Sequence, residues 1–76
     1  MPNTKNIIAA NLRAERARKG WSRRELAEET GISEATLATY ECGESRITLE
    51  TAWVLADTFG LSLDALCGRD KTKEAL

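Results

Sequence analysis

The sequence predicts an all-α domain of five short helices around one core. Two observations support this prediction: five glycines each follow a stretch of helical periodicity, and no segment shows the alternation typical of a strand. Glycine readily adopts the left-handed backbone conformation that ends a helix. A chain of 76 residues with 42% apolar content can bury one compact core. It is too short to hold a deep substrate cleft as well, which argues against an enzyme.

Three triplets of glycine, an apolar residue and serine divide the predicted helices: Gly20-Trp21-Ser22, Gly31-Ile32-Ser33 and Gly60-Leu61-Ser62. In each triplet, we expect the glycine to end one helix and the serine to cap the next. The apolar residue is expected to pack on the fourth position of the new helix, which is Leu26, Leu37 or Leu66. Ser22 and Glu25 also have the spacing of a capping box.

These signals predict helices over 7–19, 23–30, 34–42, 49–59 and 63–67, with Thr48 as the cap of the fourth. They divide the chain into an N-terminal arm (1–6), a helical domain (7–67) and a short charged tail (68–76). We expect Trp21 and Tyr40 to be core aromatics, and Trp53 with Val54 to be a partly exposed pair that can contact a partner. Periodicity assigns further core-facing positions to Ile8, Leu12, Leu26, Ala27, Leu37, Leu49, Ala52, Leu55, Ala56, Phe59, Leu63 and Leu66.

Several classes of site and protein are disfavoured by composition. The chain has no histidine and no cysteine pair at ligand spacing, so we expect neither a metal site nor a cofactor. Cys42 and Cys67 are expected to be reduced packing residues. No apolar run is long enough to span a bilayer, and no secretory signal pattern is present, so a soluble, cytoplasmic protein is expected. No nucleophile is paired with a base, so no enzymatic activity is expected.

Charge is distributed unevenly along the chain. Residues 1–24 contain seven basic groups and one acidic group, whereas residues 25–66 contain nine acidic groups and only Arg46 as a base. The corresponding formal charges are +6 and −8, and the last ten residues add +1 to give the net −1. Such segregation can create one positive face on a nearly neutral protein, which is suited to phosphates. Chance clustering on a solvated surface is the alternative explanation.

The second and third helices are joined only by Gly31-Ile32-Ser33, so they must cross steeply, as in a helix-turn-helix. The pattern Leu12-Arg13-x-x-Arg16-x-x-x-Gly20-Trp21-Ser22-x-x-Glu25-Leu26-Ala27-x-x-x-Gly31-Ile32-Ser33-x-x-Thr36-Leu37 resembles the Cro/C1-type (XRE-like) helix-turn-helix family of phage and bacterial repressors. The similarity continues through Glu41-x-Gly43 to Phe59-Gly60-Leu61-Ser62-Leu63-Asp64-x-Leu66 and covers about residues 7–67. The resemblance implies a lambda-repressor-like domain.

The resemblance further implies a sequence-specific, DNA-binding transcriptional regulator, acting as a repressor, whose third helix lies in the major groove. The residues expected to face base edges and flanking phosphates are Ser33, Glu34, Ala35, Thr36 and Thr39. Arg23 and Arg46 are expected to contact the backbone, and Arg16 with Glu41 to form a buried salt bridge. The expected partner is double-stranded DNA, bound at an inverted repeat by a homodimer that can assemble only on DNA.

The DNA-facing positions depart from the family pattern in several places. Arg23 replaces a common glutamine, Thr39 a long polar residue, Glu44 a lysine and Ile47 a proline. Glu34 has two open interpretations: it can accept a hydrogen bond from cytosine, or it can stabilise the helix dipole. These acids favour modest, salt-dependent affinity. They also motivate an alternative function, a protein-interaction module such as an antitoxin or an accessory regulator with weak DNA binding.

Overall fold

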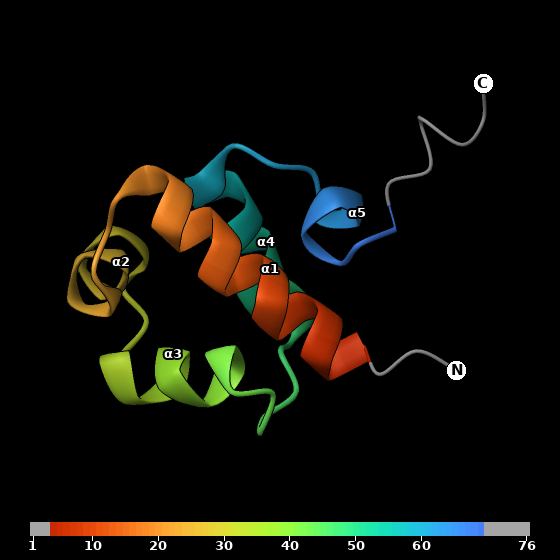
Figure 1. The fold of residues 1–76 in the computed structure, drawn as a ribbon, viewed down its shortest axis with the longest axis horizontal. Helices are drawn as coiled ribbons and strands as arrows, with labels where there is room; N and C mark the ends of the chain where they lie inside the picture. Colours follow the sequence, from red (N-terminus) through yellow and green to blue (C-terminus); the bar gives the residue numbers. More distant parts are fainter. Residues whose placement is uncertain (1–3, 70–76) are drawn as a thin grey trace.

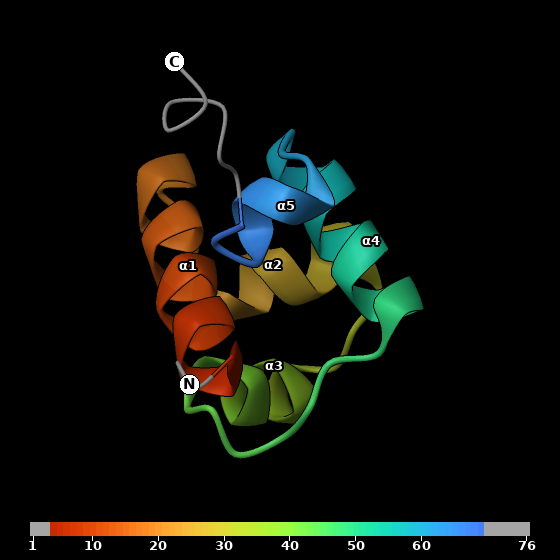
Figure 2. The same ribbon diagram turned by 90° about the vertical axis from the view of Figure 1, so that its right-hand side faces the viewer.

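The computed structural model describes residues 4–69, which form five helices and no strand (Figure 1). Helix α1 spans Thr4–Lys19, α2 Arg23–Thr30, α3 Glu34–Glu41, α4 Leu49–Phe59 and α5 Leu63–Leu66. The all-helical fold class predicted from the sequence is confirmed. In both Figures 1 and 2, α3 forms the lower edge of the molecule, so one side of this helix faces away from the other four.

The core forms where α1, α2, α3, α4 and α5 converge. Five leucines are completely buried, one from each helix: Leu12, Leu26, Leu37, Leu55 and Leu66. Trp21, Ile32 and Leu61, the apolar residues of the three triplets, pack against this cluster as expected. Trp21 also stacks on Phe59, with ring centroids 6.2 Å apart. The core therefore fixes the angles at which α2, α3 and α5 begin.

The predicted caps are present at every connection. The side chains of Ser22, Ser33, Thr48 and Ser62 each accept the backbone N–H three residues later. Ser22 and Glu25 complete the capping box, because the glutamate accepts the backbone N–H of Ser22 at 2.9 Å. Each such cap contributes about 1 kcal/mol to stability, which matters for helices of only four to eleven residues.

Some boundaries differ from those predicted. Helix α1 begins at Thr4 and so includes residues 4–6 of the predicted arm, while α3 and α5 end one residue early. The extra turn of α1 packs against the loop after α3. The contact is close, because a Cβ atom added to Gly43 in this loop would lie 2.5 Å from Asn6 Oδ1. Residues 1–3 of the arm and 70–76 of the tail lie outside the described residues.

Two predicted packing residues are instead on the surface. Leu49 is 72% exposed, because the first position of α4 projects beyond the core that Ala52, Leu55 and Ala56 contact. Cys42 is also exposed, since it caps the end of α3 where the chain turns away from the core. Both predictions were wrong. For Leu49, helical periodicity assigned a face to the residue but did not say how far the core extends along the helix axis. For Cys42, the expectation came from cysteine usage in a reducing compartment, which does not fix the burial of an individual thiol.

Candidate nucleic-acid interface

The turn between α2 and α3 holds the two helices at a fixed angle. Gly31 adopts a left-handed conformation with φ of 77°, and its N–H donates to the Ala27 carbonyl at 2.8 Å. The Thr30 hydroxyl donates to the Leu26 carbonyl at 2.8 Å and accepts the N–H of Ile32 at 3.2 Å. These bonds satisfy the N–H groups of Gly31 and Ile32 and help to fix the orientation of α3.

Helix α3 is buried along one side and exposed at its N-terminal end. Leu37 and Glu41 are buried, whereas Ser33, Glu34 and Ala35 are exposed, and Thr36 and Thr39 are half-buried. These last five are the residues expected from the sequence to face DNA bases, and we refer to them as the base-facing surface. The structure brings them together on consecutive turns of one short helix at the lower edge of the fold (Figure 2). The major groove of DNA is wide enough to admit an α-helix such as this one.

Arg23 is the first residue of α2, and its side chain lies between solvent and the interior. Its Nη2 donates to Oε1 of Glu41 at 3.3 Å, while its Nε is buried and has no hydrogen-bond partner in the structure. About 40% of the side chain is exposed. The sequence indicated a phosphate contact for Arg23 but gave no sign of this link to the last residue of α3.

Arg16 and Glu41 form a two-bond ion pair between α1 and α3. Arg16 Nε donates to Oε2 at 2.9 Å and Nη2 donates to Oε1 at 3.0 Å, with the Glu41 side chain only 1% exposed. Arg16 Nη1 donates further to the Trp21 carbonyl at 3.1 Å. Hydrogen bonding to the Glu41 carboxylate raises the pKa of the Arg16 guanidinium. The pair ties α1 to the end of α3.

Arg13 makes a structural contact with the end of α3 that the sequence did not predict. Its Nη1 donates to the backbone carbonyl of Glu41, at the end of α3. The final carbonyls of a helix lack partners within it, so a basic side chain there is favourable. Arg13 precedes Arg16 by three residues and therefore lies on the same side of α1, which was the available signal. Arg13 and Arg16 together hold the end of α3 against α1.

The loop from Cys42 to Thr48 follows α3 and leads to α4. Arg46 is exposed there and forms no ion pair with any described residue. Glu44 is exposed in the same loop. The structure thus places an exposed cation and an exposed acid in the loop beyond α3, whereas Arg23 begins α2 and reaches the last residue of α3 through its contact with Glu41.

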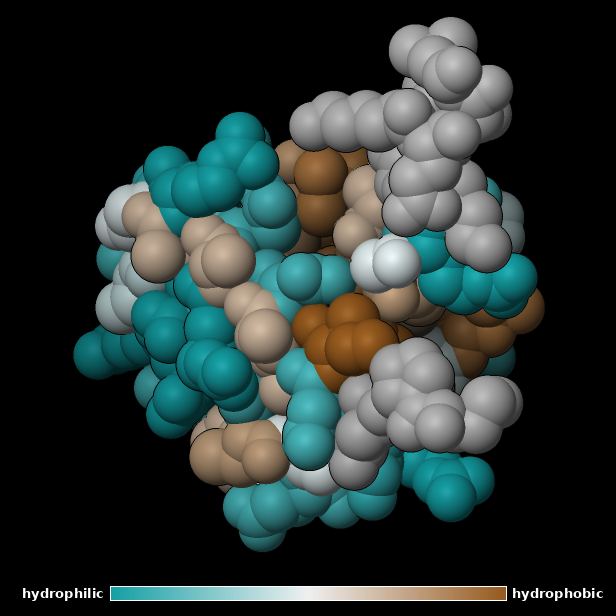
Figure 3. All heavy atoms as spheres, turned by 45° about the vertical axis from the view of Figure 1, so that its right-hand side comes forward, coloured by the Kyte–Doolittle hydropathy of each residue, from teal (hydrophilic) through white to brown (hydrophobic). Residues whose placement is uncertain are grey.

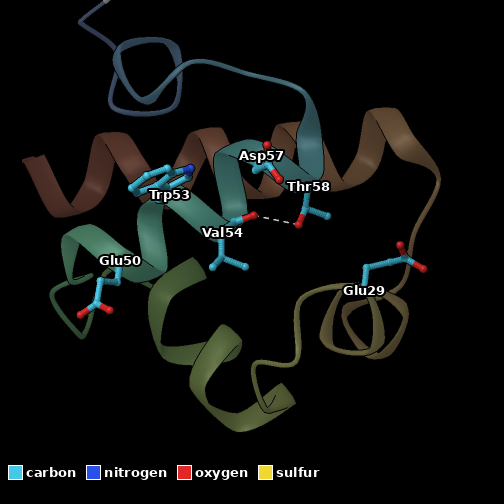
Figure 4. Close-up of a pocket in the computed structure, with 6 residues that line it drawn as sticks. All are labelled: Glu29, Glu50, Trp53, Val54, Asp57 and Thr58. Carbon is cyan, nitrogen blue, oxygen red and sulfur yellow. Dashed lines mark hydrogen bonds between the residues drawn. The ribbon is translucent and has the colours of Figure 1, made fainter.

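Helix α4 exposes an apolar face on its outer side. Leu49, Trp53 and Val54 are 72%, 66% and 41% exposed. A hollow of about 490 Å³ lies beside them, with Glu29 of α2 projecting on the opposite side from Glu50 (Figure 4). Asp57 and Thr58 complete its lining. In the view of Figure 3, the surface is largely polar and brown apolar areas are separate from one another.

Other kinds of site find no support among the described residues. Within residues 4–69, no group of three cysteine, aspartate or glutamate side chains could hold a metal ion. Over the same range, no helix is long and apolar enough to cross a membrane.

The comparisons with known proteins agree with this geometry. The chain is 42% identical over 59 residues to the HTH-type transcriptional regulator AnsR of Bacillus subtilis, covering 78% of this chain and 51% of AnsR. It is 42% identical over 50 residues to the cryptic phage CTXphi transcriptional repressor RstR of Vibrio cholerae, covering 66% of this chain and 45% of RstR. The chain thus spans about half the length of these curated relatives.

Similarity extends to solved structures and to a family model. A hypothetical transcription factor, NHTF, from Neisseria superimposes with a TM-score of 0.80 at 28% identity, covering 84% of this chain and 74% of NHTF. The helix-turn-helix family model HTH_3 matches residues 12–66, which include α2, α3, α4 and α5 entirely and the second half of α1. On this match, the chain belongs to the HTH_3 helix-turn-helix family.

Proposed function

We propose that this chain is the DNA-binding domain of a transcriptional repressor and that it reads the major groove with α3. The observation behind this proposal is the placement of α3. Buried Leu37 and Glu41 fix the helix against the core, whereas Ser33, Glu34 and Ala35 are exposed at its N-terminal end. The named functions of AnsR and RstR support the same conclusion. A domain of this kind acts in the cytoplasm, where the DNA is.

Arg23 and Arg46 are the proposed backbone contacts. Arg23 lies at the N-terminus of α2, where the unpaired N–H groups and the helix dipole also attract a phosphate. Arg46 is exposed in the loop beyond α3 and has no ion-pair partner among the described residues. Two backbone contacts from different elements would set the register of the helix in the groove.

The proposed binding unit is a homodimer on an inverted repeat, because one short helix reads too few base pairs alone. The exposed face of α4 supplies the contact between copies. Its three apolar side chains expose on the order of 300 Å² per copy, given that a large aromatic covers about 150–250 Å². Two such faces bury less than the roughly 1,200 Å² of a standard interface. The dimer would therefore assemble only when DNA holds both copies close together.

A selection experiment tests the proposed function. The purified chain is used to select binders from a random duplex library at two salt concentrations, and the enriched DNA is sequenced. We expect an inverted repeat whose half-sites lie about one helical turn, or ~34 Å, apart. A pool that remains random at both salt concentrations, from a chain that is folded by circular dichroism, would contradict the proposal.

A second candidate function is supported by the charge around α4. The hollow beside Trp53 and Val54 is lined by Glu29, Glu50 and Asp57 and by no basic residue. An apolar surface with an acidic rim is suited to a basic, apolar segment of another protein, as expected for an antitoxin or accessory regulator. The same selection separates the two candidates, because an interaction module without DNA binding enriches no sequence.

A further inference from the structure

The hydroxyl groups of the base-facing surface are engaged mainly within α3 itself. Thr39 Oγ1 donates to the Thr36 carbonyl at 2.7 Å. Ser33 Oγ accepts the backbone N–H of Thr36 at 3.1 Å and shares a 2.8 Å hydrogen bond with Thr36 Oγ1. Each hydroxyl carries one proton, so the hydrogen bond between Ser33 and Thr36 uses one of the two protons of this pair. Of the three hydroxyls, only one proton remains available to DNA.

The other two side chains of this surface cannot donate at all. Glu34 is exposed, and its carboxylate forms no side-chain hydrogen bond or ion pair with any residue that the structure describes. A carboxylate is an acceptor only. Ala35 is exposed and offers a methyl group. Helix α3 therefore presents acceptors and a methyl group, with no arginine, lysine, asparagine or glutamine at these five positions.

We propose that this acceptor-rich surface selects a cytosine at the base pair facing Glu34 and a thymine methyl group beside Ala35. This inference rests on the proposed function and specifies its DNA target. In the major groove, cytosine presents an amino donor, which suits a carboxylate, whereas guanine presents two acceptors, which repel it. Adenine also presents an amino group, but its N7 acceptor lies beside it, so cytosine is the better partner. The thymine methyl group packs on an alanine side chain.

Glu34 also lies in the first turn of α3, where any acid stabilises the helix dipole. That role and base recognition have different consequences. An acid that acts only through the dipole changes the stability of the domain and leaves its base preference unchanged. An acid that accepts from cytosine changes the preference at one base pair per half-site. Asp64, in the first turn of α5 and away from α3, provides a matched control for the dipole effect.

The test selects binders from a random duplex library with four chains: wild type, Glu34→Ala, Glu34→Gln and Asp64→Asn. We expect the wild type and Asp64→Asn to enrich the same half-site, with one required cytosine. Glu34→Ala should lose the preference at that position only, and Glu34→Gln should shift it to adenine, the usual partner of an amide. In competition assays, duplexes in which another base replaces this cytosine should bind the wild-type chain about tenfold or more weakly.

Two results would overturn the inference. One is a wild-type site that requires guanine, rather than cytosine, on the strand facing position 34. The other is a Glu34→Ala chain that retains the wild-type base preference at every position. Failure of the proposed function looks different, since a folded wild-type chain then enriches no sequence at all, and the inference falls with it.

Discussion

The carboxylate of Glu41 joins two arginines that come from different helices. Arg16 of α1 binds both carboxylate oxygens, at 2.9 and 3.0 Å, and Arg23 of α2 binds one of them, at 3.3 Å. Glu41 ends α3, so this one buried group connects the N-terminal three helices. One negative charge between two positive ones leaves the cluster with a net charge of +1. The remaining charge lies on the partly exposed Arg23, toward the proposed DNA side.

Replacing Arg16 should destabilise the domain strongly. In Arg16→Ala, the carboxylate of Glu41 remains buried with only the longer contact from Arg23, and an unpaired buried charge costs about 3–5 kcal/mol. The partial exposure of the Arg16 side chain, at 22%, puts our expectation at the lower end, about 3 kcal/mol. Because 1 kcal/mol shifts Tm by about 4–8 °C in a domain of this size, thermal unfolding should show a loss of at least about 12 °C.

Arg18→Ala is the control for this prediction. Arg18 is also an arginine of α1 and forms an ion pair with Glu15 at 3.0 Å, but its side chain is 73% exposed. Exposed pairs of this spacing contribute only about 0.3–0.5 kcal/mol, so Tm should change by a few degrees at most. If Arg16→Ala and Arg18→Ala unfold at the same temperature, the Arg16–Glu41 pair does not stabilise the fold.

Replacing Arg23 should weaken DNA binding without changing its base preference. Arg23→Gln removes one proposed phosphate contact, so the slope of log K against log salt should fall in magnitude by about 0.9. Equilibrium titration of the selected duplex at several salt concentrations measures this slope. Arg18→Gln removes the same charge from the exposed side of α1 and should leave the slope nearly unchanged. Equal slopes for both variants and the wild type would mean that Arg23 contacts no phosphate.

Much of the fold could be predicted because its signals are local. A cap or a helix end depends on residues a few positions apart, and the serine caps and glycine ends are visible as a repeated pattern. The burial of Leu49 was wrongly predicted because it depends on where the core ends, which is a property of the assembled helices.

The positions that make up the candidate site could be predicted from the sequence, but the hydrogen bonds of their side chains could not. The sequence, through its family resemblance, indicated which positions of α3 point outward. It could not show that the Arg23 side chain reaches Glu41, 18 positions away, or that Arg13 reaches the end of α3. Nor could it show that the Thr39 hydroxyl is engaged by its own helix. Each of these contacts depends on the rotamer that a side chain adopts after the helices have packed.

The exposed face of α4 should be needed for cooperative binding to a full site. Trp53→Ala removes the central side chain of this face, and the residue is 66% exposed, so the stability of the monomer should change little. We expect affinity for a single half-site to be unchanged, while cooperativity between two half-sites falls by about 5- to 150-fold, as for a coupling of about 1–3 kcal/mol. Gel-shift titrations on half and full sites measure both quantities.

Salt provides an internal check on that prediction. Glu50 and Asp57 flank Trp53 on α4, so two such faces bring like charges together. Screening these charges should raise cooperativity as salt increases, while affinity for the half-site falls. Unchanged cooperativity in Trp53→Ala would assign this face to another partner, such as the basic segment considered above.

Cys42, which follows the last residue of α3, should be more reactive than Cys67, because the two thiols differ in exposure. Cys42 is exposed and Cys67 is half-buried, so an alkylating reagent should modify Cys42 first in the folded chain. Mass spectrometry after brief labelling identifies the modified residue, and Cys42→Ser should remove the fast phase. Cys42 begins the loop that contains Arg46, so a duplex bound across α3 and this loop should slow the labelling of Cys42. Faster modification of Cys67 would contradict the expected difference in reactivity, and a Cys42 rate unaffected by saturating DNA would contradict the expected position of the duplex.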